Sequence, residues 1–168
     1  EAGLYEQSTY TPIATSFPNG CHICEVEVDR ETGKIDLVKY TAVDDVGTVI
    51  NELTLEGQIH GGIAQGVGQA LMENVSYDPS NGQMLSGSFL DYSMPRADDF
   101  CDFNIRNNPI PTQNNVLGVK GAGEAGTTGA LPAVMNAVNH ALKDAGVRHL
   151  EMPLTAEKVW QALKLPVA

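Results

Sequence analysis

The chain has few of the residues that would place it in several common classes of protein. It holds only 3 cysteines in 168 residues, too few for a fully paired disulfide framework. Basic residues are also scarce, with 10 Lys and Arg against 21 Asp and Glu and a net charge of −11. Such a field repels phosphate, so we expect neither nucleic acid nor an anionic membrane surface as a partner. No apolar run approaches the roughly 20 residues of a spanning helix, and no signal peptide is recognisable.

The remaining composition is that of an ordinary globular domain. Hydrophobic residues make up 42% of the chain and charged residues 18%, which gives enough apolar surface to offset the entropy lost on ordering. One domain is expected at this length, and it should bury roughly 70% of its unfolded surface. Because Glu1 is not an initiator methionine, we expect the chain either to be cut from something longer or to have lost a first residue.

Two of the cysteines form an isolated C-x-x-C motif, Cys21 and Cys24, within a run that alternates as a strand. The alternation places the two thiols on opposite faces. A zinc site needs four ligands, and no second pair of cysteines or nearby histidine cluster completes one. The sequence therefore predicts no metal site, reduced thiols and a cytoplasmic location.

The hydrophobic pattern predicts an α+β fold. Residues 1–19 are rich in Thr, Ser and Pro and are expected to form an extended N-terminal segment, whereas residues 20–168 form the folded part. Strands are expected over 21–28 and 35–44, joined by turn residues into a β-hairpin. A helix is expected over 53–73, because its apolar residues recur every four positions. These residues are Leu55, Ile59, Ile63, Val67 and Leu71.

The second half of the chain is less regular. Short strands are expected over 74–77, 84–91 and 102–107, and residues 108–128 are expected to be irregular. A second long helix should begin near Leu131, with Pro132 in its first turn, and end at Gly146. A last helix should run from Ala156 to Leu163, with Thr155 as its N-cap. Together these elements predict a mixed sheet packed against two long helices and a short C-terminal helix.

The first long helix carries an unusual number of glycines, five between residues 57 and 69. Each interior glycine costs a helix roughly 1 kcal/mol relative to alanine, and the cost is acceptable where another backbone or a cofactor must come close. Gln58, Gly62, Gln65 and Gln69 share one helix face, where their primary amides can grip a polar ligand. The alternative is a helix packed tightly on a sheet, with its glutamines in solvent.

A second glycine-rich stretch, residues 118–129, contains a single carboxylate, Glu124. Glycines let backbone N–H groups turn toward an anion, and a helix start adds favourable potential. A carboxylate held away from bulk water there can be tuned as a general base. One alternative is a flexible turn with an exposed Glu. Another is a nucleotide-binding loop, since Gly121-x-Gly123-x-x-Gly126 matches the G-x-G-x-x-G pattern, although the short apolar run before it and the late helix start expected after it disfavour that reading.

Taken in order, several stretches resemble the molybdopterin-binding large subunit of the molybdenum hydroxylases, the xanthine dehydrogenase, aldehyde oxidase and carbon monoxide dehydrogenase family. The matching stretches are Glu25-Val-Glu-Val-Asp29 with Glu31-Thr-Gly33, Asp45-Val-Gly47 with Val49-Ile-Asn51, Gly57-Gln58 through Gly68, Asp91-Tyr-Ser-Met-Pro95, Lys120-Gly-Ala-Gly-Glu124 and the segment 133–142. The resemblance covers nearly the whole chain from Gly20 onward. One departure is Glu52, where relatives commonly have Pro.

The resemblance implies that the chain is the C-terminal part of a catalytic subunit that hydroxylates a carbon centre with oxygen taken from water. It also implies that Glu124 is the general base of this reaction, since desolvation raises the basicity of a carboxylate. Cofactor contacts are implied for the start of the glycine-rich helix and for the loop before the base, at Gln58, Lys120, Gly121, Ala122 and Gly123.

The implied cofactor is a molybdopterin-type molybdenum cofactor, with the cytosine dinucleotide form as one candidate. Family large subunits are several times longer than this chain, so the resemblance also implies the remainder of the molybdenum subunit as a partner. Iron–sulfur clusters and FAD are expected in partner domains or subunits, and the substrate is a small molecule. Without these parts the 168-residue chain is expected to show no turnover. A catalytically silent structural or assembly module is a further alternative.

Overall fold

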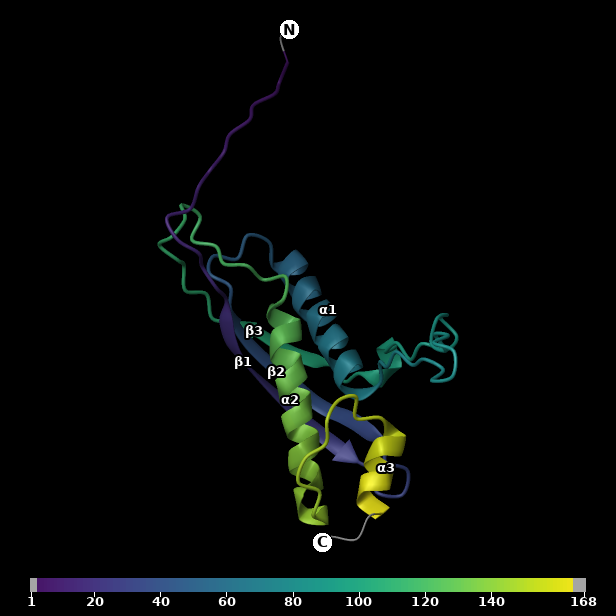
Figure 1. The fold of residues 1–168 in the computed structure, drawn as a ribbon. Helices are drawn as coiled ribbons and strands as arrows, with labels where there is room; N and C mark the ends of the chain where they lie inside the picture. The colour runs from purple at the N-terminus through teal and green to yellow at the C-terminus, as the bar shows by residue number, and fades with distance from the viewer. Residues whose placement is uncertain (1–2, 165–168) are drawn as a thin grey trace.

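The computed structural model describes residues 3–164, which form a three-stranded sheet, two long helices and one short helix (Figure 1). Helix α2 lies along strand β1, and helix α1 packs beside α2 and touches β3. The predicted α+β class and the packing of two long helices on a mixed sheet are confirmed. The elements in chain order are β1 (Asn19–Val28), β2 (Ile35–Asp45), α1 (Glu52–Leu71), η1 (Ala97–Asp99), β3 (Phe103–Asn107), α2 (Ala125–Leu142), η2 (Lys143–Ala145) and α3 (Ala156–Lys164).

The predicted β-hairpin is confirmed and forms the first two strands of the sheet. Strands β1 and β2 pair antiparallel from Asn19 opposite Asp45 to Val28 opposite Ile35. The connecting turn needs Gly33, because its φ of 75° lies in the left-handed region that residues with a Cβ rarely adopt. Strand β3 then pairs parallel with β2. The sheet is therefore mixed, in the order β1-β2-β3.

Helix α1 is confirmed, and all five residues of its predicted apolar stripe are buried. It begins after the N-cap Asn51, whose side chain accepts the Thr54 N–H at 2.9 Å. Glu52 is thus the first helical residue, the position at which proline fits a helix well, since the N–H that proline lacks has no partner there. The departure from the family pattern at this residue leaves the start of the helix intact.

The strands predicted over 74–77 and 84–91 are wrong. Residues 74–91 form no helix or strand, and their pairing is limited to an isolated bridge between Tyr77 and Met84. Between these two residues the chain turns back, with the Gly82 N–H donating to the Asp78 carbonyl at 2.8 Å. Figure 1 shows the segment projecting from the body of the molecule near the end of α1. A strand needs a partner backbone, and the projecting segment has none among the described residues beyond this bridge.

Helix α2 begins at Ala125, six residues before the predicted start, and Pro132 lies inside it. A proline within a helix removes one backbone hydrogen bond and costs about 3 kcal/mol or more. Tertiary packing offsets this cost, because Gly126 and Ala130 in the early turns are buried against α1. The predicted end at Gly146 is confirmed, since Gly146 adopts a left-handed conformation after η2.

The described chain begins with an extended segment and ends with the short helix α3. Residues 3–18 contain no helix or strand and are mostly exposed, and Figure 1 shows them extending away from the sheet. At the other end, α3 is confirmed with Thr155 as its N-cap, which accepts the Lys158 N–H at 3.4 Å. The predicted extended segment includes residues 1 and 2, which lie outside the described residues. No helix between residues 3 and 164 combines the length and apolarity needed to cross a membrane.

Candidate functional site

The glycine-rich loop, residues 118–124, runs from the end of the sheet to the start of α2. It is tied to the segment that follows β2, where the Lys120 N–H donates to the Val46 carbonyl at 2.9 Å and the Thr48 N–H donates to the Gly118 carbonyl at 2.9 Å. Gly47 and Val119 also form an antiparallel bridge. The loop is therefore fixed to the sheet at its beginning, while its last residues project toward the helices.

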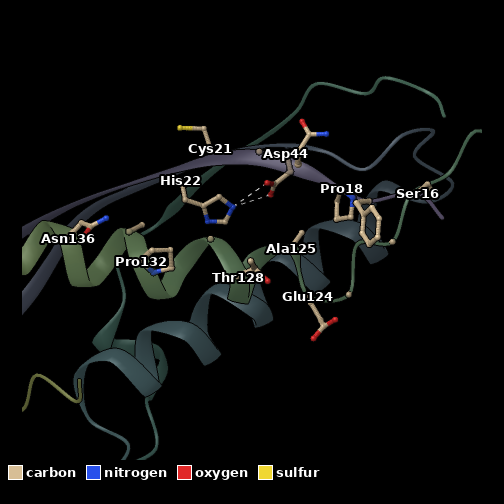
Figure 2. Close-up of a pocket in the computed structure, with 17 residues that line it drawn as sticks. Ser16, Pro18, Cys21, His22, Asp44, Glu124, Ala125, Thr128, Pro132 and Asn136 are labelled. Carbon is tan, nitrogen blue, oxygen red and sulfur yellow. Dashed lines mark hydrogen bonds and ion pairs between the residues drawn. The ribbon is translucent and has the colours of Figure 1, made fainter. Parts of the chain in front are cut away.

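Five of the six predicted site residues belong to this loop and the sixth, Gln58, lies on α1; together they line two cavities. Gln58, Lys120 and Ala122 line a cavity of about 300 Å³. Gly121, Gly123 and Glu124 line a larger cavity of about 800 Å³ (Figure 2). The two cavities lie against successive residues of the same loop. The side-chain nitrogen of Gln58 would lie 3.8 Å from a Cβ added at Gly123, so helix α1 brings its glutamine to the loop although Gln58 and Glu124 face different cavities.

Glu124 is the N-cap residue of α2, and its side chain makes no capping hydrogen bond to the helix. Its backbone carbonyl accepts the Thr128 N–H at 2.9 Å, which fixes the residue to the first turn. The side chain is exposed, and Figure 2 shows its carboxylate pointing away from His22 and Asp44. The carboxylate is thus free to accept a proton from another molecule. Exclusion of water from it requires parts of the protein beyond the described residues.

Lys120 has a different environment from the one expected for a cofactor contact. Its ammonium group forms an ion pair with Asp45, and the two side chains are only 11% and 7% exposed. The same carboxylate accepts the Gly47 N–H at 2.9 Å and the Ile110 N–H at 3.0 Å. The hydrogen bond from Lys120, followed by these two, holds the pKa of Asp45 well below its usual range. The positive charge of Lys120 is therefore neutralised by Asp45, and a bound cofactor would contact the backbone or the aliphatic part of Lys120.

The five glycines of α1 fall into two groups with different environments. Three lie in tight contact: a Cβ added at Gly62 would lie 2.9 Å from the Thr127 nitrogen, one at Gly66 would lie 2.7 Å from the Ala130 Cβ, and one at Gly68 would meet Glu73 and Pro95. The close approach of the α2 backbone therefore explains Gly62 and Gly66. At these positions α1 packs tightly on α2, and elsewhere it contacts strand β3 of the sheet.

The other two glycines, Gly57 and Gly61, have nothing within 4 Å of an added Cβ among the described residues. Helical geometry places Gly61 on the side of α1 that carries Gln58, since the two are three residues apart, whereas Gly57 lies about 100° around the helix from Gln58. Gly121, in the neighbouring loop, is equally open. An exposed amide beside bare backbone fits a flat, heteroatom-rich group such as a pterin, because the amide offers two donors and an acceptor and the glycines leave room for close approach.

The larger cavity contains a histidine that the motifs did not indicate, His22 on β1 (Figure 2). Its Nε2 lies 3.2 Å from Asp44 Oδ1, and both side chains are 4% exposed. Its Nδ1 lies 2.8 Å from the hydroxyl of Tyr40, which is fully buried. Because a carboxylate only accepts, the ring donates to Asp44 from Nε2. Burial raises the pKa of Tyr40 far above its usual range, so the phenol keeps its proton.

The cysteines lie as the alternating pattern predicts, with Cys21 exposed and Cys24 partly buried on the other face of β1. Burial, with smaller contributions from Cys101 and Glu25, raises the pKa of Cys24 to about 12. All three thiols are free. Between residues 3 and 164, no three His, Cys, Asp or Glu side chains are grouped so that they could hold a metal ion.

The glycine loop has only part of the geometry expected of a nucleotide-binding motif. A helix does begin directly after the loop, at Ala125. In front of it, however, Val119 forms an isolated antiparallel bridge with Gly47, and the described chain has no parallel strand leading into Gly121. A dinucleotide loop joins a parallel strand directly to a helix, so this feature of the motif is missing.

Known proteins match this chain over nearly its whole length. The sequence profile of the molybdopterin cofactor-binding domain family matches residues 1–101, so the chain belongs to this family. It is 42% identical over 164 residues to the nicotine 6-hydroxylase large subunit of Paenarthrobacter nicotinovorans, covering 98% of this chain and 20% of that protein. It is 35% identical over 164 residues to the carbon monoxide dehydrogenase large chain of Hydrogenophaga pseudoflava, with the same coverage of 98% and 20%.

Solved structures show the same likeness in three dimensions. Quinoline 2-oxidoreductase from Pseudomonas putida 86 matches with a TM-score of 0.82 and 38% identity, over 89% of this chain and 19% of that one. The chain thus spans about a fifth of the length of the relatives it matches. By their names these relatives belong to a dehydrogenase, a hydroxylase and an oxidoreductase, which fits the enzyme family that the sequence motifs predicted. The family profile ends before the glycine loop, whereas the two relatives match almost the entire chain.

Proposed function

We propose that this chain is the C-terminal part of a molybdenum hydroxylase catalytic subunit, in which Glu124 is the general base. The reaction is the oxidative hydroxylation of a carbon centre, with water as the source of oxygen. The observation that carries the proposal is the position of Glu124. It projects from the start of α2 with no capping hydrogen bond, on a loop that Gln58 reaches from α1. Membership of the molybdopterin cofactor-binding family supports the same assignment.

In this proposal Gln58 and the loop backbone bind the cofactor, and Glu124 transfers the proton. When bound, the molybdopterin-type cofactor, in its cytosine dinucleotide form or a simpler one, supplies the redox chemistry. The amide of Gln58 would hold the polar groups of this cofactor, because it offers both donors and an acceptor, and the open surface at Gly61 would leave room for it beside the helix. The backbone of residues Gly121 to Gly123 would hold it from the loop. The Glu124 carboxylate, which is exposed and makes no capping hydrogen bond, accepts a proton from the oxygen that water supplies.

The proposal assigns the rest of the subunit a structural task, because the chain exposes apolar side chains around the site. Phe17, Ile50, Leu53, Val116 and Leu117 are each at least 62% exposed. Exposed apolar residues in this number mark surfaces that other segments cover. We assign the cover to the remainder of the molybdenum subunit, which would also shield Glu124 from water. Iron–sulfur and FAD centres in partner domains or subunits, and a cytoplasmic location, complete the proposal.

The test is the substitution Glu124→Gln in the complete molybdenum subunit. The amide keeps the size of the side chain but cannot accept the proton as the carboxylate does, so turnover should fall by roughly 10²- to 10⁴-fold. Molybdenum content and the affinity for substrate should stay at the wild-type level. Glu27→Gln, at an exposed position on β1, is the matched control and should change neither. Full turnover in Glu124→Gln would refute the role of Glu124 and leave a silent structural module as the better description.

A further inference from the structure

We propose that Asp44 and Asp45, two consecutive buried carboxylates at the end of β2, are positioning residues that hold the two segments flanking Glu124. The inference rests on the proposed function of Glu124. Asp45 acts through Lys120, four residues before the base, and Asp44 acts through His22, which supports α2 five residues after it. Because successive residues of a strand point to opposite sides, one strand end can hold both segments at once.

The first anchor joins four segments of the chain at one carboxylate. Asp45 pairs with Lys120 of the glycine loop and accepts N–H groups from Gly47 and Ile110. The Asn19 side-chain amide at the start of β1 adds a weaker contact at 3.4 Å. With four donors directed at it, the Asp45 carboxylate has little freedom to move, and its ion pair restricts the Lys120 side chain as well. The loop is therefore held at residue 120 by a side-chain contact as well as by the Val46 backbone.

The second anchor is the contact between His22 and α2. A Cβ added at Gly129 would lie 2.5 Å from the ring of His22, so the helix backbone rests directly on the imidazole. The ring in turn is fixed from both ends, by Asp44 at Nε2 and by Tyr40 at Nδ1. Any tilt of the ring would be transmitted to the second turn of α2, and through it to Glu124 at the N-cap.

The energetics favour a positioning role over a purely stabilising one. A buried ion pair gains little net stability, because the loss of hydration offsets most of the attraction between the charges. Apolar residues of similar volume often stabilise such a site as well or better. What the charged and hydrogen-bonded groups add is direction, since each donor and acceptor fixes the orientation of its partner. Here both sets of bonds end on segments that carry the proposed base.

The test uses the complete molybdenum subunit with isosteric substitutions. Asp44→Asn and Asp45→Asn keep the side-chain shape but remove the charge, and Gly129→Ala pushes the His22 ring away without changing any charge. Displacing a catalytic group by about 1 Å can cost roughly 10²-fold, so each variant should lower kcat per bound molybdenum by roughly 10- to 100-fold with KM unchanged. The control is Glu25→Gln, which breaks the exposed pair with Lys39 on the same hairpin and should leave kcat unchanged.

A second readout separates this inference from the proposed function. Amide hydrogen exchange of residues 118–129 in the cofactor-free subunit should be faster in all three variants than in Glu25→Gln, with the rest of α2 unaffected. Unchanged exchange in this segment would overturn the inference, whatever Glu124→Gln does. Faster exchange with unchanged kcat would also overturn it, because the segment would be held but not for catalysis. If instead Glu124→Gln keeps full turnover, it is the proposed function that fails, and exchange still reports whether the anchors hold the loop.

Discussion

Two neighbouring glycines of α1 allow the packing between the long helices to be tested with one type of substitution. Gly61→Ala adds a methyl group that meets nothing within 4 Å, whereas Gly62→Ala adds one 2.9 Å from the Thr127 nitrogen and 3.0 Å from the Gly126 Cα. Both gain the same helix propensity, about 1 kcal/mol. Only the second must push the backbone of α2 away, and overpacking of this kind costs roughly 1–3 kcal/mol.

The assay is chemical or thermal unfolding of the 168-residue chain. Gly61→Ala should be more stable than the wild type by up to about 1 kcal/mol, which raises the Tm by roughly 2–4 °C at this size. Gly62→Ala should be less stable than Gly61→Ala by roughly 1–3 kcal/mol. Equal shifts for the two variants would refute the close approach of the helices at Gly62. In the complete subunit, Gly61→Ala should lower molybdenum content, because the open patch beside Gln58 is the proposed cofactor surface.

Three further results are expected. Protonation of Asp45 breaks its ion pair with Lys120. Because the folded pKa of Asp45 is depressed, this carboxylate contributes its full stability above the ordinary value of 3.8 and loses it as the pH falls below that value. The stability difference between wild type and Asp45→Asn, measured by urea unfolding from pH 5 to pH 2, should therefore shrink, and a constant difference would contradict this. At pH 8 a thiol-alkylating reagent should modify Cys21 well before Cys24, whose thiol stays protonated with a pKa of about 12; peptide mapping that finds equal labelling would show that Cys24 is not shielded. The 168-residue chain alone should bind little molybdenum cofactor and show no turnover, and stoichiometric metal with activity would contradict the assignment to a larger subunit.

The parts of the fold that local pattern encodes were predictable. The four-residue spacing from Leu55 to Leu71 gave helix α1 and its buried face, and the turn chemistry around Gly33 gave the hairpin. The start of α2 was not predictable in the same way. Local rules place Pro132 in a first turn, but packing against α1 extends the helix back to Ala125. That packing joins residues more than sixty positions apart, and no local pattern contains it.

The candidate site shows a similar division. Glu124 was expected in a glycine-rich loop ahead of the second long helix, but its position directly before that helix came from the structure. The network around His22 does not follow from the motifs, because it depends on strand register. A regular hairpin with Val28 opposite Ile35 would pair His22 with Thr41, but the register shift between Glu25 and Val26 places His22 opposite Ala42, on the buried face.

The environment of Lys120 is a second feature that the motif did not predict. Its place in the glycine loop suggested a contact with the cofactor, whereas its ammonium group is paired with Asp45, 75 positions away in the sequence. Long-range ion pairs of this kind appear only when the chain folds the two segments together. The family motif therefore pointed to Lys120 as a residue of the loop, and the electrostatic partner of Lys120 came from the structure.

The central claim is tested most directly by measuring turnover per bound molybdenum in the complete subunit carrying Glu124→Gln. The account predicts a loss of roughly 10²- to 10⁴-fold at wild-type molybdenum content, with Glu27→Gln unaffected. Wild-type turnover in Glu124→Gln at full molybdenum content would contradict it.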